Sequence, residues 1–154
     1  MRNVEKWFAE YDESHQNHAN ELFHWICIPI IMFSLLGLLS EAPLFVVPWN
    51  ALANVASVFI LLALIFYFRL SWQLALGMML VVSIMVAGHV GLRRVGWLPL
   101  WQICIGLFVL GWIGQFIGHK IEGKKPSFFK DIQFLLIGPI WLLAAVYRRA
   151  GVPY

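Results

Sequence analysis

The feature that most constrains this chain is a succession of apolar segments, most of them long enough to cross a membrane. A helix needs about 20 apolar residues to span about 30 Å of hydrocarbon. Only 12% of the 154 residues are charged and 61% are hydrophobic, which is far from the balance of soluble proteins. We therefore predict an all-α, polytopic membrane helical bundle of about five spans, which forms a single integral membrane domain over residues 1–154. The expected spans cover residues 22–39, 51–68, 72–90, 100–118 and 132–147.

The connections between these spans are short or contain helix breakers. Residues 69–71 leave room only for an antiparallel hairpin between the second and third spans. Residues 91–99 are expected to form a loop before the fourth span. The fifth segment is interrupted by Gly138-Pro139, so it is either a kinked span or a re-entrant helix.

The residues before the first span predict a short amphipathic helix over positions 4–13. Val4, Trp7, Phe8 and Tyr11 recur at helical spacing with charged residues between them. Such a helix is expected to lie along the membrane surface. The N-terminal residues do not have the pattern of a signal peptide, so we expect the first span to act as its own insertion signal.

Basic residues set the expected orientation, because Lys and Arg accumulate on the cytoplasmic side of a membrane protein. A cytoplasmic N-terminus places seven of the 11 basic residues inside, and Arg93, Arg94, Arg148 and Arg149 outside. The short chain favours a bacterial inner membrane, with the endoplasmic reticulum as its eukaryotic counterpart. The basic residues near the ends of spans favour anionic lipid headgroups over nucleic acid as partners. In this topology, the start of the first span and the end of the fourth lie on the same side.

The first polar cluster stands at the start of the first span and contains His15, His18 and His24. On one straight helix, His15 and His24 would lie on opposite faces, about 13.5 Å apart along the axis. They can share an ion only if the helix breaks between them, and Asn17 and Asn20 are both favourable N-caps for such a break. We interpret His18 as a capping or headgroup-facing residue.

A second polar cluster ends the fourth span. Gln115, His119 and Glu122 lie within about 60° of one another on one helix face. Together with His15 and His24, His119 could complete a mononuclear transition-metal site, for which imidazole suits iron, zinc and copper alike. Five histidines are too few for a diiron centre of the desaturase kind, and we interpret His89 as a helix-end residue on the opposite side. Cys27 and Cys104 both lie inside apolar segments and are expected to be buried and unpaired.

The two clusters form one recognisable pattern along the chain. It reads Tyr11-x3-His15-x4-Asn20-x3-His24 followed by Ile28-Pro29, and later Gln115-Phe116-Ile117-Gly118-His119-x2-Glu122-Gly123-Lys124-Lys125-Pro126. This pattern resembles the family of small membrane dioxygenases that includes the fungal 2-hydroxy fatty acid dioxygenase of phytosphingosine breakdown. The resemblance extends over nearly the whole chain in length and layout of spans.

The resemblance implies an Fe(II)-dependent oxidation of a 2-hydroxy fatty acid with O2, giving carbon dioxide and a fatty acid one carbon shorter. It implies ligand or catalytic importance for His15, His24 and His119, and supporting roles for Asn20, Gln115 and Glu122. Either Glu122 or Gln115 would orient a ligand imidazole, and Glu122 is also a candidate ligand. Lys124 and Lys125 are candidates to attract the substrate carboxylate, or simply anchor the inner membrane face, while the acyl chain lies among apolar spans.

A second hypothesis is a non-catalytic small membrane protein that binds a metal or haem or takes part in transport. A transport path would need polar residues along the second and third spans. These segments and their ends offer only a few polar side chains, namely Asn54, Ser57, Ser71, Gln73 and Ser83. A Soret band in the purified protein would support haem.

Overall fold

Helices account for the regular structure of the described residues, which are 4–13, 15–44, 53–123 and 128–154 of a computed structural model, without the side chains of 128–133. The all-α prediction is confirmed for this part of the chain. The six helices are α1 Val4–Asp12, α2 His18–Glu41, α3 Val55–Leu70, α4 Trp72–Val95, α5 Leu100–Glu122 and α6 Phe128–Ala150.

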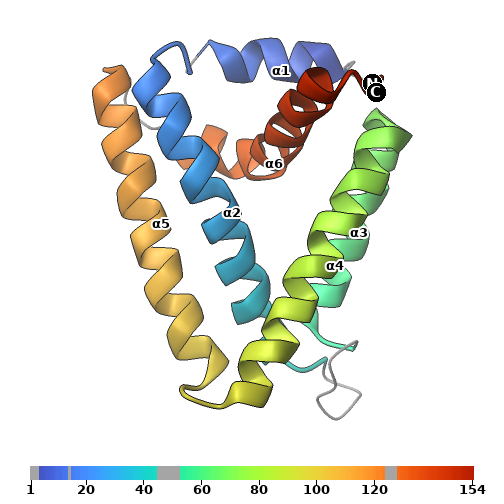
Figure 1. Cartoon of the computed structure of the whole chain (residues 1–154), viewed down its shortest axis with the longest axis vertical. Helices are drawn as coiled ribbons and strands as arrows, with labels where there is room; N and C mark the ends of the chain where they lie inside the picture. The colour runs from blue at the N-terminus through green and yellow to red at the C-terminus, as the bar shows by residue number, and fades with distance from the viewer. Residues whose placement is uncertain (1–3, 14, 45–52, 124–127) are drawn as a thin grey trace.

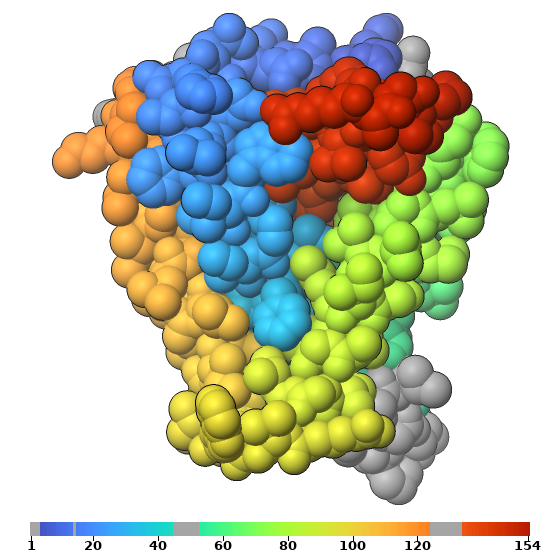
Figure 2. Space-filling model, in the orientation of Figure 1, coloured from blue at the N-terminus to red at the C-terminus, as the bar shows by residue number. Residues whose placement is uncertain are grey.

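Two pairs of helices form the body of the molecule (Figure 1). One pair is α2 with α5, and the other is the hairpin of α3 with α4. The pairs lie close together at one end of the molecule and diverge towards the other. At the wide end, α1 runs across the bundle and α6 lies beneath it, between the two pairs. The space-filling view shows α6 filling the gap between α2 and α4 at this end (Figure 2).

Fewer helices have the length and hydropathy of a membrane span, among the described residues, than the five that the sequence predicted. Among the described residues, α2, α4 and α5 are long and apolar enough to cross a membrane. The helix α3 is apolar but has only 16 residues. The prediction of a membrane helical bundle is therefore supported, whereas the prediction of about five spans is supported only for these three helices.

The last apolar segment does not carry the chain to the opposite end of the molecule. Helix α6 continues through Pro139 to Ala150, and the C-terminal Tyr154 lies beside α1 at the wide end, with its ring centroid 6.3 Å from that of Phe8 (Figure 1). The guanidinium carbon of Arg149 lies 5.3 Å from the ring centroid of Trp25, near the start of α2. The placement of Arg148 and Arg149 on the side opposite the N-terminus was therefore wrong. Apolar length alone does not distinguish a helix that crosses from one that returns.

The α2–α5 pair packs closely because glycines on one face of α5 meet side chains of α2. A Cβ atom at Gly118 would lie 2.5 Å from Asn20 Oδ1, and one at Gly111 would lie 2.7 Å from Ile31 Cγ1. Cys27 fills the space beside Gly114, which lies between these two positions. Small residues at a membrane helix interface allow the two backbones to approach in this way. The expectation that Cys27 is buried and unpaired is confirmed, and it holds for Cys104 as well.

One local expectation from the sequence differs from the structure, and the expected short helix before the first span is confirmed as α1. The expected loop over 91–99 is largely helical, since α4 continues to Val95 and ends at Gly96, whose φ of 68° is the left-handed conformation typical of a helix C-terminus. Basic side chains in the last turn of α4 interact favourably with the helix dipole and support this extension. Helix α1 buries Val4, Phe8 and Tyr11 within the protein core, where α1 packs on α6. Its apolar face is thus used for packing inside the protein.

Candidate metal centre

The break that the sequence predicted between His15 and His24 is present. Helix α1 ends at Asp12, and Asn17 caps the N-terminus of α2 with its side chain, which accepts a hydrogen bond from Ala19 N at 2.9 Å. His15 lies in the connection between the two helices and turns back towards α2. His24 projects from the second turn of α2.

Three histidines converge at this point, one from the α1–α2 connection, one from α2 and one from the last turn of α5. One ring nitrogen from each of His15, His24 and His119 lies within 4.8 Å of the other two. The ring centroids of His15 and His24 are 4.2 Å apart, and that of His119 lies 5.8 and 5.1 Å from them. The predicted convergence of these three side chains is therefore observed.

Backbone hydrogen bonds fix which nitrogen of two of these rings faces the centre. Nδ1 of His15 donates to the carbonyl oxygen of Tyr11 at 2.6 Å, and Nδ1 of His24 donates to that of Asn20 at 2.9 Å. A carbonyl oxygen only accepts, so each Nδ1 carries the proton and each Nε2 keeps its lone pair. This is the tautomer in which a histidine binds a metal through Nε2.

The environment of His15 keeps this ring neutral. Burial lowers the pKa of His15 from its ordinary value, and nearby His119 lowers it further. The Tyr11 ring stacks on His15 with centroids 4.0 Å apart and planes 9° from parallel. The Trp141 ring of α6 lies beside His15, with centroids 5.9 Å apart. The Trp141 Nε1 donates a hydrogen bond to Asp12 Oδ1 at 2.6 Å. The neutral imidazole is the form that binds a metal.

Glu122 fastens the α1–α2 connection to the end of α5. Its Oε1 accepts from Gln16 N at 3.0 Å, and its Oε2 accepts from Asn17 N at 2.9 Å and from Asn20 Nδ2 at 3.0 Å. A carboxylate at the N-terminus of a helix is favoured by the backbone N–H groups and the helix dipole. Both oxygens of Glu122 accept hydrogen bonds from the α1–α2 connection and the start of α2. Because His15 lies in that connection and His119 is three residues before Glu122, these bonds fix the two histidines relative to each other.

The three-histidine cluster has the donor set and geometry of a metal site. His15 Nε2 is buried and has no hydrogen-bond partner among the described residues, which is costly unless another group binds it. Two nitrogens about 2.1 Å from one ion are at most about 4.2 Å apart, so small ring rotations bring separations up to 4.8 Å into range. Within the described part of the chain, the cluster of possible ligands consists of these three histidines and contains no carboxylate.

Comparison with known proteins shows the family to which the chain belongs. Residues 1–150 match the family model described as 2-hydroxy-palmitic acid dioxygenase Mpo1-like. The chain belongs to the Mpo1-like family. It is 28% identical over 146 residues to the 2-hydroxy-palmitic acid dioxygenase MPO1 of Saccharomyces cerevisiae, a match that covers 92% of this chain and 78% of the yeast protein. No solved structure matches the chain.

The sequence of this Mpo1-like protein also predicted Asn20, Gln115, Lys124 and Lys125 as site residues, and it placed His18 and His89 outside the site. Asn20 and Gln115 are both buried, Asn20 is bonded to Glu122, and Gln115 lies four residues before His119 on α5. His18 lies outside the cluster, with a side chain 95% exposed. His89 is buried six residues before the end of α4, and its Nε2 donates to Phe33 O at 2.9 Å. Lys124 and Lys125 lie outside the described residues.

Sequence reasoning missed the aromatic and acidic residues that enclose His15. Tyr11 belongs to the pattern shared with the family, and its position four residues before His15 was a usable signal for a stacked or backbone-bonded pair. Asp12 and Trp141 are 129 positions apart and carry no common sequence signal. Only the return of α6 beneath α1 brings them together.

Proposed function

We propose that this Mpo1-like protein is an Fe(II)-dependent dioxygenase that shortens 2-hydroxy fatty acids by one carbon. The observation that supports this most directly is the convergence of three histidines, two of which have Nδ1 bonded to a backbone carbonyl and so keep the lone pair on Nε2. Three protein ligands leave open positions on a transition metal, which is the arrangement typical of iron oxygenases. The name of the yeast relative supplies the substrate class.

The proposed reaction balances with O2 as the only oxidant. A 2-hydroxy fatty acid and O2 give a fatty acid one carbon shorter, carbon dioxide and water, and the bond between C1 and C2 is broken. Four electrons leave the substrate and reduce both oxygen atoms of O2. Bound Fe(II) would supply the activation of O2, and imidazole ligands are compatible with that ion.

The protein's own residues would hold the histidines and limit access by water. Glu122 and Asn20 fix the relative position of the α1–α2 connection and α5 through the hydrogen bonds described above. Tyr11 and Trp141 cover His15 with aromatic surface. Outside the described residues, Lys124 and Lys125 follow α5 in the sequence and are proposed to attract the substrate carboxylate.

The wide end of the bundle is proposed to face the cytoplasm. The basic residues Lys6, Lys120, Arg148 and Arg149 belong to helix ends on this side, whereas Arg93 and Arg94 are on the other. With Arg148 and Arg149 on this side, the excess of basic residues at the wide end over the narrow end is larger than the sequence predicted. The positive-inside rule places the more basic side in the cytoplasm. Cysteine labelling of positions 18 and 97 in sealed vesicles would test this orientation.

The experiment is direct. The protein, purified in detergent and loaded anaerobically with Fe(II), is mixed with 2-hydroxypalmitate and O2, and the products are separated by mass. We expect pentadecanoic acid. His119→Ala should lower turnover by more than about 100-fold, since losing a group that merely orients a ligand already costs about 10- to 100-fold. It should also lower the iron content.

The matched control is His18→Ala, which removes a histidine from the same segment but from an exposed position. We expect this variant to keep both its iron and its activity. The proposal is wrong if the wild-type protein shortens no 2-hydroxy acid and His119→Ala binds as much iron as the wild type.

A transport function is less compatible with the structure. Asn54 and Ser71 cap the N-termini of α3 and α4, and Ser83 donates to the carbonyl oxygen of Met79 within its own helix. These polar groups serve the helices that carry them and do not form a continuous path. A Soret band in the purified protein would instead support the haem alternative.

A further inference from the structure

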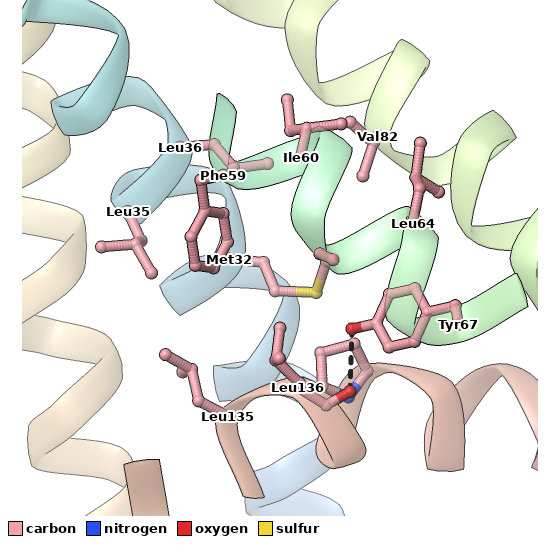
Figure 3. Close-up of a pocket in the computed structure, with 12 residues that line it drawn as sticks. Met32, Leu35, Leu36, Phe59, Ile60, Leu64, Tyr67, Val82, Leu135 and Leu136 are labelled. Carbon is pink, nitrogen blue, oxygen red and sulfur yellow. Dashed lines mark hydrogen bonds between the residues drawn. The ribbon is translucent and has the colours of Figure 1, made fainter. Parts of the chain in front are cut away.

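An apolar pocket lies between the two helix pairs, next to α6 (Figure 3). Its volume is about 470 Å³, including the part open to the surroundings. Four helices contribute to its walls, with Met32 and Leu36 from α2, Ala63 and Tyr67 from α3, Val82 from α4 and Leu135 from α6.

The chemistry of the walls favours a hydrocarbon ligand. Every lining side chain is apolar except that of Tyr67, whose hydroxyl donates to the carbonyl oxygen of Leu136 at 2.8 Å (Figure 3). The one polar side chain of the wall is therefore already engaged. Burying methylene groups in such a pocket is favourable by about 0.8 kcal/mol for each group.

The pocket and the histidine cluster lie along the same two helices, α2 and α6. On α2, His24, Ile28 and Met32 follow one another at intervals of four residues, so Met32 lies about 12 Å along the helix from His24. On α6, Gly138 lies beside Ile28 and Tyr11, with its absent Cβ position 3.0 Å from Ile28 Cδ1 and 3.1 Å from the Tyr11 hydroxyl. The next residue, Pro139, lines the pocket.

We propose that this pocket binds the acyl chain of the 2-hydroxy fatty acid whose carboxyl end is held at the histidine cluster. The inference rests on the proposed function and specifies how that site would select its substrate. A chain that runs from the cluster along α2 would reach Met32 with its middle carbons. The end of the chain would then lie against Ala63 and Leu135. Long acids would fill the pocket, and short ones would not reach it.

Chain-length selectivity provides the first test. Ala63→Phe adds a ring inside the pocket, and the matched control Leu62→Phe adds one on the outer face of the same helix, where Leu62 is 61% exposed. We expect Ala63→Phe to lower kcat/KM for 2-hydroxypalmitate by about tenfold, the effect of losing about two buried methylene groups. Turnover of 2-hydroxyoctanoate should stay within about threefold, and Leu62→Phe should alter neither.

Equal losses for the long and the short acid in a folded, iron-loaded Ala63→Phe protein would overturn the proposal. So would an unchanged preference for the long acid. If the wild-type protein turns over neither acid, the proposed function fails, and the pocket is tested by the second experiment alone.

That second experiment needs neither iron nor turnover. Wild-type protein is irradiated with a 2-hydroxy fatty acid that carries a diazirine at its far end, and the labelled peptides are identified by mass spectrometry. We expect label in α3 near Ala63 and in α6 near Leu135, reduced by an excess of 2-hydroxypalmitate. Label elsewhere, or label in the pocket that is not reduced by 2-hydroxypalmitate and is matched by a diazirine phospholipid, would show that bulk lipid occupies the pocket and would overturn the proposal.

Discussion

The α2–α5 pair and the α3–α4 pair are built from similarly apolar sequence but pack in different ways. The first pair meets along glycines, has polar residues at one end and carries two of the three clustered histidines. The second is a hairpin with a single-residue connection whose helices pack less extensively on each other, and α3 supplies the largest share of the wall of the open pocket. Close packing is found between α2 and α5, which carry two of the three histidine side chains of the proposed metal site. Looser packing is found where a flexible chain is proposed to bind.

This comparison is most severely tested at Gly118. Gly118→Val would place a side chain against Asn20 Oδ1, which cannot move away without breaking the bond between Asn20 and Glu122. Phe23 Cβ, only 3.1 Å from the same Cβ position, closes the other side. We expect loss of iron binding and of nearly all turnover, measured by metal analysis and product formation. Overpacking of a tight core costs about 1–3 kcal/mol or more.

Gly106→Val on the same helix is the control, since nothing lies within 4 Å of the Cβ position there. It should leave iron content unchanged, and replacing a helical glycine should be neutral or slightly stabilising. Equal losses of iron and turnover in Gly118→Val and Gly106→Val would mean that close packing between α2 and α5 is not needed to form the site.

A smaller effect is expected at the carboxylate that joins the two elements of the site. Glu122→Gln keeps the shape of the side chain but loses the charge and one of the two acceptor oxygens that Gln16 N, Asn17 N and Asn20 Nδ2 use. We expect iron affinity to fall by about 10- to 100-fold, measured by competition with a chelator. Glu21→Gln, in the first turn of α2, should change the affinity little. An unchanged affinity in Glu122→Gln would show that His15 is positioned by other contacts.

The smallest effect belongs to the second pair. Tyr67→Phe removes the hydrogen bond from α3 to the Leu136 carbonyl and should lower stability by about 1 kcal/mol. Thermal unfolding in detergent would measure this loss. Iron affinity should stay the same, because Tyr67 contacts neither the histidines nor Glu122. A loss of iron affinity in Tyr67→Phe would mean that the hydrogen bond between α3 and α6 also supports the histidine cluster.

The sequence predicted the parts of the site that depend on local rules. Asn17 is a good N-cap, which was enough to expect a helix break that frees His15 from α2. The antiparallel course of α2 and α5 placed His24 and His119 at the same end. The course of α6 could not be predicted, since apolar length is compatible with both crossing and returning. Trp141 and the pocket depend on that course and on how the helix pairs diverge, so no local signal marks them.

The hydrogen bonds of Glu122 have a consequence for the order of folding. They join residues 102–106 positions apart, and His119 follows His15 by 104 positions and His24 by 95. Contacts of such long range form late, because the chain between them must be ordered first. During synthesis, His15 and His24 enter the membrane region long before α5 exists. A chain stopped after α4 would carry two of the three clustered histidines and no Glu122 to hold them, so the proposed metal site would form only when α5 is in place.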